Sequence, residues 1–65
     1  MPHQSLDFTG VENAEQVNRI TTALMMVDGV ESAEVGRHGA EVEGRVSREA
    51  LIRAVEALKL PIQIK

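Results

Sequence analysis

The sequence contains no cysteine, tryptophan or tyrosine, and Phe8 is its single aromatic residue. Without cysteine the chain can form no disulfide, no thiolate metal site and no cysteine nucleophile. Binding of single-stranded nucleic acid normally uses aromatic side chains on which bases stack, and these are almost absent. The net charge of −3 also opposes binding to the phosphates of DNA. We therefore expect no nucleic-acid partner.

No apolar stretch approaches the length of a membrane span, because the longest covers only residues 23–27. The first residues also lack the basic patch and apolar segment of a secretory signal. We therefore expect a cytoplasmic protein without direct membrane insertion. The length of 65 residues, with 43% hydrophobic and 26% charged residues, predicts a single globular domain over residues 1–65.

Charge is divided unevenly along the chain. Residues 1–35 carry a net charge of −5, whereas residues 36–65 carry +2. One interpretation is that these charges simply solvate the surface. The other is that the first half builds most of an acidic face that selects a basic partner surface.

The first half of the chain shows two different apolar periods. Residues 5–9 alternate between apolar and polar, which predicts a half-buried strand that Gly10 ends. From Asn13 the period becomes helical, with apolar side chains at Val17, Ile20, Leu24 and Val27. The pair Asp28-Gly29 is typical of a helix end.

The second half repeats this pattern. Strands are predicted over residues 30–35 and 40–45, and Ser47 is suited to cap a second helix. The apolar stripe of that helix consists of Leu51, Ile52, Ala54, Val55 and Leu58. Pro61 bars its continuation, and residues 62–64 fit a short edge strand.

The resulting order is βαββαβ. Two strand–helix–strand units of this kind close into an α+β, ferredoxin-like fold, in which a four-stranded antiparallel sheet carries both helices on one face. The other face of the sheet is then open to water.

Four stretches resemble the heavy-metal-associated domain of copper chaperones, mercury-binding proteins and heavy-metal P-type ATPases. They are residues 10–24, 27–30, 42–44 and 51–57. The family pattern is G-M-x-C-x-x-C, followed by an apolar position, R-I, a leucine and then G-V. The resemblance covers almost the whole chain, and it implies the same ferredoxin-like fold and an ancestry in metal transport.

The chain departs from the family at the residues that bind metal. Asn13 and Gln16 stand where the family has its two cysteines, and Val11 replaces the methionine. The pair Lys59-Leu60 stands where the family has glycine and an aromatic residue. Because Cu(I) and similar soft ions prefer thiolates to amide oxygens, the resemblance implies a degenerate metal site and no bound cofactor.

Two roles are open for this degenerate loop, which consists of Gly10, Val11, Glu12, Asn13, Glu15 and Gln16. Asn13-x-x-Gln16 has capping-box spacing, so Asn13 can accept from the N–H of residue 16 and Gln16 can reach the N–H of residue 13. Glu12 and Glu15 complement the positive helix end. Alternatively, four of these side chains form a weak oxygen cage for a hard cation, although hard cations prefer six or more oxygens.

Histidine and methionine offer further candidate ligands. His3 and His38 could bind Zn(II) or Cu(II) if they were close, but we expect separate surface histidines. Met25 and Met26 each fall roughly 130° from the apolar stripe of the first helix, on opposite sides of it. We expect both to be largely exposed or at the edge of the sheet. One interpretation is that they contact a partner protein or a second copy, and the other is that one packs under a loop and the other has no role. A thioether Cu(I) site is a weaker alternative.

No set of residues with the spacing of a catalytic triad or a phosphate-binding loop is present, so we expect no enzyme activity. The leading hypothesis is a protein-docking or regulatory module that uses Glu12, Glu15, Arg19, Met25 and Met26. The alternative is a divergent metal carrier with non-cysteine ligands. A third hypothesis is a small-molecule regulatory domain, whose loop over residues 10–13 lines a dimer pocket.

Overall fold

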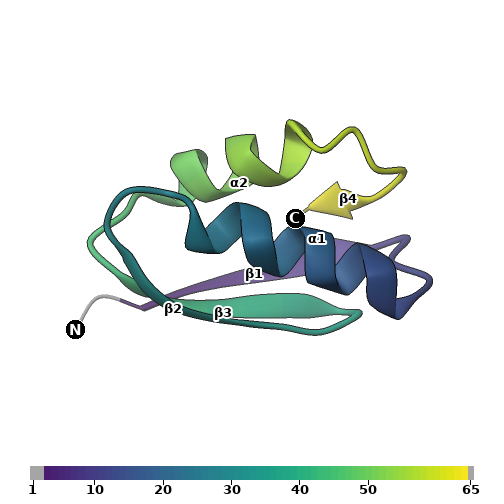
Figure 1. Cartoon of the computed structure of the whole chain (residues 1–65), viewed down its shortest axis with the longest axis horizontal. Coiled ribbons are helices and arrows are strands. Elements are labelled where there is room, and N and C mark those ends of the chain that lie inside the picture. The colour runs from purple at the N-terminus through teal and green to yellow at the C-terminus, as the bar shows by residue number, and fades with distance from the viewer. Residues whose placement is uncertain (1–2, 65) are drawn as a thin grey trace.

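The computed structural model describes residues 3–64 and contains six elements in the order β1 (His3–Thr9), α1 (Ala14–Met25), β2 (Val30–Val35), β3 (Gly39–Gly44), α2 (Arg48–Glu56) and β4 (Gln63–Ile64). The strands form one sheet in the order β2-β3-β1-β4, and each neighbouring pair is antiparallel. Both helices cover the same face of this sheet (Figure 1). The ferredoxin-like α+β fold expected from the sequence is confirmed.

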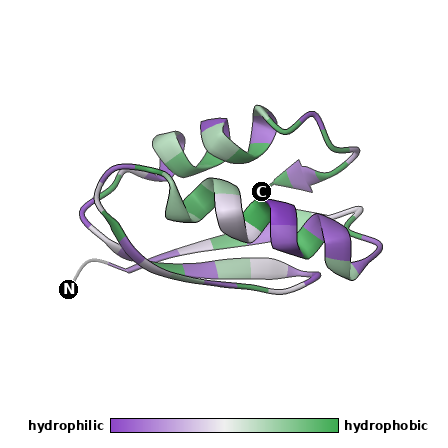
Figure 2. Ribbon diagram, in the orientation of Figure 1, coloured by the Kyte–Doolittle hydropathy of each residue, from purple (hydrophilic) through white to green (hydrophobic). Residues whose placement is uncertain are grey.

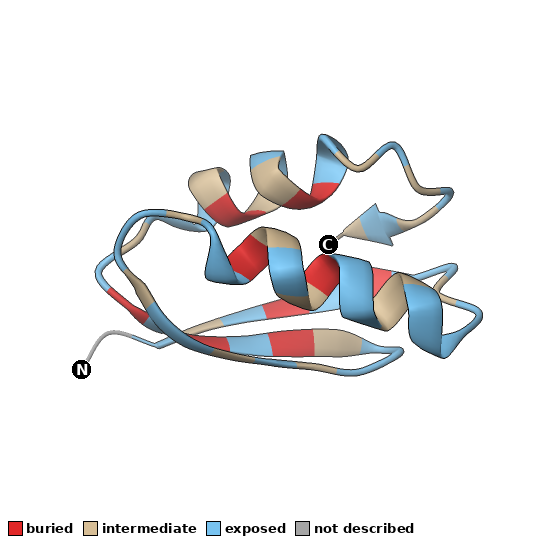
Figure 3. Cartoon of the chain, in the orientation of Figure 1, coloured by how far each residue is buried: buried red, intermediate tan, exposed pale blue. Residues whose placement is uncertain are grey.

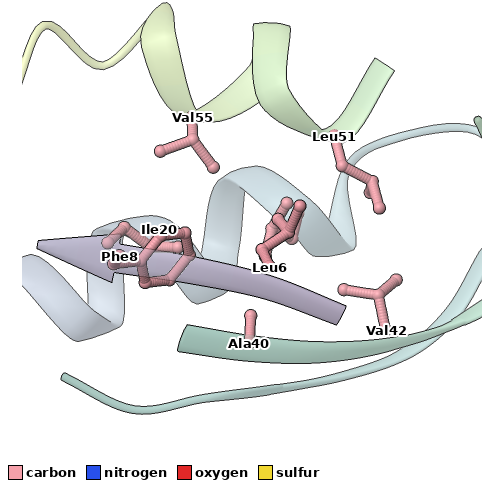
Figure 4. Packing of buried hydrophobic residues seen from close by; sticks show 8 residues of the cluster. Leu6, Phe8, Ile20, Ala40, Val42, Leu51 and Val55 are labelled. Atoms are coloured by element: carbon pink, nitrogen blue, oxygen red, sulfur yellow. The ribbon is translucent and has the colours of Figure 1, made fainter. Parts of the chain in front are cut away.

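The core lies between the helices and the sheet. Its eight buried apolar residues are Leu6, Phe8, Ile20, Leu24, Ala40, Val42, Leu51 and Val55. They come from β1, β3 and both helices, and their side chains converge in one layer (Figure 4). Burial follows a period of two along β1 and β3 and the helical period along α1, so one face of each element is covered (Figure 3).

The hydropathy of the ribbon follows the same division. Apolar positions of α1 and α2 turn toward the sheet and hydrophilic positions turn outward (Figure 2). Burying a large aliphatic side chain stabilises a fold by about 1.5–3 kcal/mol, so this thin layer supplies much of the stability of so short a chain.

Both helices begin where the sequence predicts. Asn13 caps α1, and the hydroxyl oxygen of Ser47 accepts a hydrogen bond from the backbone N–H of Ala50 at 3.2 Å. The predicted end of α1 is too late, however. The helix stops at Met25, and Val27 lies in the following turn, where its N–H donates to the carbonyl of Leu24.

The turn after α1 is held against the end of β3. Gly29 has φ +95°, and its carbonyl accepts a hydrogen bond from the N–H of Arg45 at 3.0 Å. A Cβ atom built on Gly44 would lie 2.1 Å from the same carbonyl oxygen of Gly29. Glycine is therefore required at Gly44 by close backbone contact as well as by its positive φ.

Candidate functional site

The loop between β1 and α1 occupies the place of the metal-binding loop in the resembling family. Gly10 begins it with φ +94°, a conformation that glycine adopts without strain. A Cβ at this position would lie 2.6 Å from the carbonyl oxygen of Pro61, so the loop packs tightly against the segment before β4. The side chains of Asn13 and Gln16 follow at the start of α1.

Asn13 and Gln16 form a reciprocal pair of caps. The Asn13 Oδ1 accepts a hydrogen bond from the N–H of Gln16 at 2.9 Å, as the spacing predicts. The Gln16 Oε1 accepts from the N–H of Glu12 at 2.6 Å, rather than from the N–H of residue 13. That detail of the prediction was wrong, because the loop turns the Glu12 N–H, one residue earlier, toward the glutamine side chain.

This arrangement uses the oxygens that a metal ion would need. Each amide oxygen points at a backbone N–H that would otherwise lack a partner at the helix start. Among residues 3–64, no group of three or more His, Asp and Glu side chains is placed to hold a metal ion. The amide oxygens of Asn13 and Gln16 do not fit a soft ion such as Cu(I), and the oxygen cage considered from the sequence stays a prediction.

Beside the loop, the surface of α1 forms a shallow groove of about 490 Å³. Its lining is mostly apolar and consists of Glu15, Asn18, Arg19, Thr22, Ala23, Met26 and Leu58. Arg19 and Glu15 pair across one helical turn, with Nη2 and Oε1 3.8 Å apart, and both are exposed. A smaller hollow of about 220 Å³ adjoins it and is lined by Asn13, Glu15, Gln16, Arg19 and Leu60.

The two methionines lie where the helical spacing places them. Met26 is 79% exposed and lines the groove on the side of α1 that faces Leu58. Met25 is 46% exposed and leans toward the other side of the helix, away from that groove. Of the five predicted interaction residues, the groove brings together Glu15, Arg19 and Met26.

The histidines do not meet. His3 lies at the start of β1, whereas the carbonyl of His38 accepts from the N–H of Phe8 at 2.8 Å near the other end of that strand. The strand rise places these two positions about 17 Å apart. His3 Nε2 instead lies 3.4 Å from Glu41 Oε1 on the exposed sheet face.

The exposed sheet face also carries a cross-strand cluster of His3, Ser5 and Glu41, which the sequence did not predict. Ser5 donates a hydrogen bond of 2.5 Å to Glu41 Oε2, while His3 contacts the other oxygen of the same carboxylate. The hydrogen bond from Ser5 lowers the pKa of Glu41, and the charge of His3 lowers it further. These are the residue types of a hydrolytic triad, but the carboxylate lies between the other two, so the histidine cannot take a proton from the serine.

Comparison with known proteins supports the fold. No protein-family model matches the chain. No curated protein matches it either. Among solved structures, a CopZ metallochaperone superposes with a TM-score of 0.87 at 20% identity, over 98% of this chain and 100% of that one.

Two domains of P-type ATPases are similar as well. A copper-binding domain from the P-type ATPase HMA7 has a TM-score of 0.86 and 27% identity, over 100% of this chain and 95% of that one. The N-terminal domain of a potential copper-translocating P-type ATPase from Bacillus subtilis, in its Cu(I)-loaded state, has a TM-score of 0.83 and 29% identity, over 97% of this chain and 82% of that one.

Neither α1 nor α2 combines the length and the apolar character that a membrane crossing requires.

The superpositions confirm in three dimensions the resemblance that the sequence shows. This cysteine-free chain is similar to the heavy-metal-associated domains of copper chaperones and P-type ATPases, and it lacks their CxxC motif.

Proposed function

We propose that the chain is a protein-docking or regulatory module that keeps the heavy-metal-associated fold without a tight site for soft metals. One observation carries this proposal: the side chains at the two family cysteine positions cap the helix. Asn13 Oδ1 and Gln16 Oε1 each accept a hydrogen bond from the loop backbone, at 2.9 and 2.6 Å. Amide oxygens engaged in this way are poor ligands for Cu(I).

The docking surface that we propose is centred on the groove along α1. Met26 supplies a flexible apolar side chain at one end, and Glu15 and Arg19 supply charges of both signs at the other. Methionine adapts its shape to different partners, and a polar rim around an apolar centre is typical of protein interfaces. Glu12 extends this surface just before the start of α1, whereas Met25, the fifth predicted interaction residue, lies on the other side of the helix and outside the groove.

The known properties of the similar structures favour a role in metal transport. These structures include a metallochaperone and a copper-binding domain of a P-type ATPase. We propose that this chain descends from such a module, meets a protein partner, and has no catalytic activity of its own. A cytoplasmic location and a domain over residues 1–65 stay predictions from the sequence.

A divergent metal carrier is the alternative, and one titration separates the two. The ¹⁵N-labelled chain is titrated with Cu(I) under reducing conditions and separately with Zn(II), while the amides of residues 12–16 and the rings of His3 and His38 are followed. Our proposal predicts no saturable change at one equivalent of either ion. A saturating, stoichiometric shift in either region would contradict the proposal and establish a carrier with oxygen or nitrogen ligands.

A further inference from the structure

Strand β2 borders the sheet, with β3 on one side and no described strand on the other (Figure 1). The register pairs Ala33 with Val42, Glu34 with Glu41 and Val35 with Ala40. An edge of this length offers a row of backbone N–H and C=O groups to another chain. Native proteins commonly protect such edges, so the chemistry beside this edge determines what it can accept.

The register identifies which backbone groups face outward. The N–H of Gly36 donates to the carbonyl of Gly39 at 2.8 Å, just beyond the last residue of β2. Because hydrogen-bonded pairs alternate in an antiparallel ladder, Glu34 points its backbone groups toward β3 in the same way as Gly36. The backbone groups of Ala33 and Val35 therefore point away from the sheet.

The inner side of this edge is apolar. Ala33 and Val35 are half-buried and pack against the core, and α1 lies over β2. Thr21 and the 46% exposed Met25 stand on the side of α1 opposite to Leu58, which is the side above β2. An added strand would place its inward side chains next to Ala33 and Val35, on the side of α1 that carries Thr21 and Met25, where small apolar residues fit.

The outer side of the same edge is acidic. Glu34 lies directly opposite Glu41, and Glu43 lies opposite Ser32, two residue pairs further along the strands. Carboxylates placed directly opposite each other destabilise a sheet. Lysine or arginine side chains on an added strand would lie next to Glu34 and reduce this repulsion. A second copy of β2 would instead bring its own glutamates to the same face.

We propose that the free edge of β2 binds an extended segment of a partner protein as an added antiparallel strand, with Lys or Arg side chains alternating with small apolar ones. The backbone of Ala33 and Val35 supplies the hydrogen bonds, Met25 covers the inward side chains, and Glu34 selects the basic ones. This surface lies across α1 from the groove that contains Met26, so it does not depend on the docking role proposed above.

The test uses a blocked six-residue peptide in which lysine alternates with valine, titrated to millimolar concentration against the ¹⁵N-labelled chain. Hydrogen exchange at the amides of Ala33 and Val35 is expected to slow about tenfold when the peptide saturates the chain, because these amides gain partners. The amides of Ser32 and Glu34 already face β3 and are expected to change little. A peptide that alternates glutamate with valine is expected not to bind.

Two variants of the chain locate the binding surface. Glu34→Lys is expected to weaken peptide binding about fivefold or more, since an attraction between cross-strand neighbours becomes a repulsion. Glu56→Lys makes the same change of charge on the exposed surface of α2, far from β2, and is expected to change affinity less than about twofold.

Four results would overturn the proposal. They are the absence of any shift at millimolar peptide, shifts confined to the α1 groove, equal losses of affinity in the two variants, and protection of Ala33 and Val35 that rises with protein concentration without peptide. The last result would assign the edge to a second copy of the chain.

Discussion

At the scale of single residues, Asn13 caps α1 at a position where the resembling family has a cysteine. Its side chain accepts a hydrogen bond from the Gln16 N–H at 2.9 Å, and its extended backbone leads directly into α1. A cysteine at this position would be a weak acceptor and a poor cap. Our proposal therefore predicts that Asn13 and Gln16 favour the start of α1 at the expense of affinity for soft metals.

Replacing this cap tests its structural role. Asn13→Ala is expected to lower the free energy of unfolding by about 1 kcal/mol, because the Gln16 N–H loses its acceptor. Urea denaturation followed by circular dichroism measures the change. Asn13→Asp keeps an acceptor oxygen and is the matched control, with stability expected near that of the parent. Equal stability of the alanine variant and the parent would show that the cap contributes nothing.

Glu41 provides a test of the exposed sheet face. The hydrogen bond from Ser5 is the largest cause of its lowered pKa, and desolvation acts in the opposite direction. Ser5→Ala is therefore expected to raise the pKa of Glu41 toward its ordinary value of 4.5. An NMR pH titration of the Glu41 side chain measures the pKa. Ser32→Ala is the control, because Ser32 lies on the same exposed face of the sheet, in β2, and this variant should leave the pKa of Glu41 unchanged.

The same shift gives the sign of the pH dependence. Because the pKa is lower in the folded state, the charged form of Glu41 stabilises the fold above about pH 4.5, and this contribution is lost as the pH falls through the folded-state pKa. In Ser5→Ala the folded-state pKa approaches the unfolded-state value, so this pH-dependent loss of stability should be smaller. An unchanged pKa in this variant would contradict the assigned hydrogen bond.

At the scale of elements, the turn that follows α2 contains a residue in a strained backbone conformation. Lys59 has φ +54°, in the left-handed region, and its N–H donates to the carbonyl of Glu56 at 3.0 Å. The resembling family has glycine at this position, and glycine adopts this conformation without the steric cost of a Cβ.

Lys59→Gly is accordingly expected to stabilise the domain by about 1 kcal/mol, because the steric cost of a left-handed non-glycine residue disappears. Thermal unfolding compares the variant with the parent. Lys59→Ala removes the same charge but keeps the Cβ, so it serves as the control and should not gain this stability. A glycine variant no more stable than the alanine variant would mean that the strain is absorbed elsewhere.

Most elements could be predicted from the sequence because their signals are local. Ser47 and Asn13 sit immediately before their helices, and the alternation around Leu6 marks a strand whose inner face is buried. The end of α1 was placed too late because Val27 keeps the helical spacing, although the chain has already turned toward Gly29. Apolar spacing alone does not distinguish a helical position from a turn that packs on the same core.

The candidate site could be predicted only where its contacts are short in sequence. The Asn13–Gln16 cap spans a single helical turn, so the spacing of the two residues predicts the contact. The contact between Ser5 and Glu41 joins residues 36 positions apart and depends on the register of β1 against β3. Register is set by the packing of the whole sheet, so no local pattern reveals this cluster or the acidic pair Glu34 and Glu41.

At the scale of the whole molecule, the two faces have different chemistry. The helix face carries a mostly apolar groove around Met26, whereas the open sheet face carries Asp7, Glu34, Glu41 and Glu43. The acidic face expected mainly from the first half of the chain thus draws on both halves, because β3 brings its glutamates between β1 and β2. Our two proposals use these two regions separately, the groove for docking and the acidic edge of the sheet for an added strand.

The central claim is that this scaffold has kept its fold and lost its soft-metal site, and a Cu(I) competition titration tests it most directly. The chain and its Asn13→Cys/Gln16→Cys variant compete under reducing conditions with a chromophoric Cu(I) chelator. Our account predicts that the double variant takes one equivalent of Cu(I) from the chelator, while the parent chain takes none. Sub-micromolar binding of Cu(I) by the parent monomer would contradict the account and would make Met25, Met26, His3 and His38 the residues to replace.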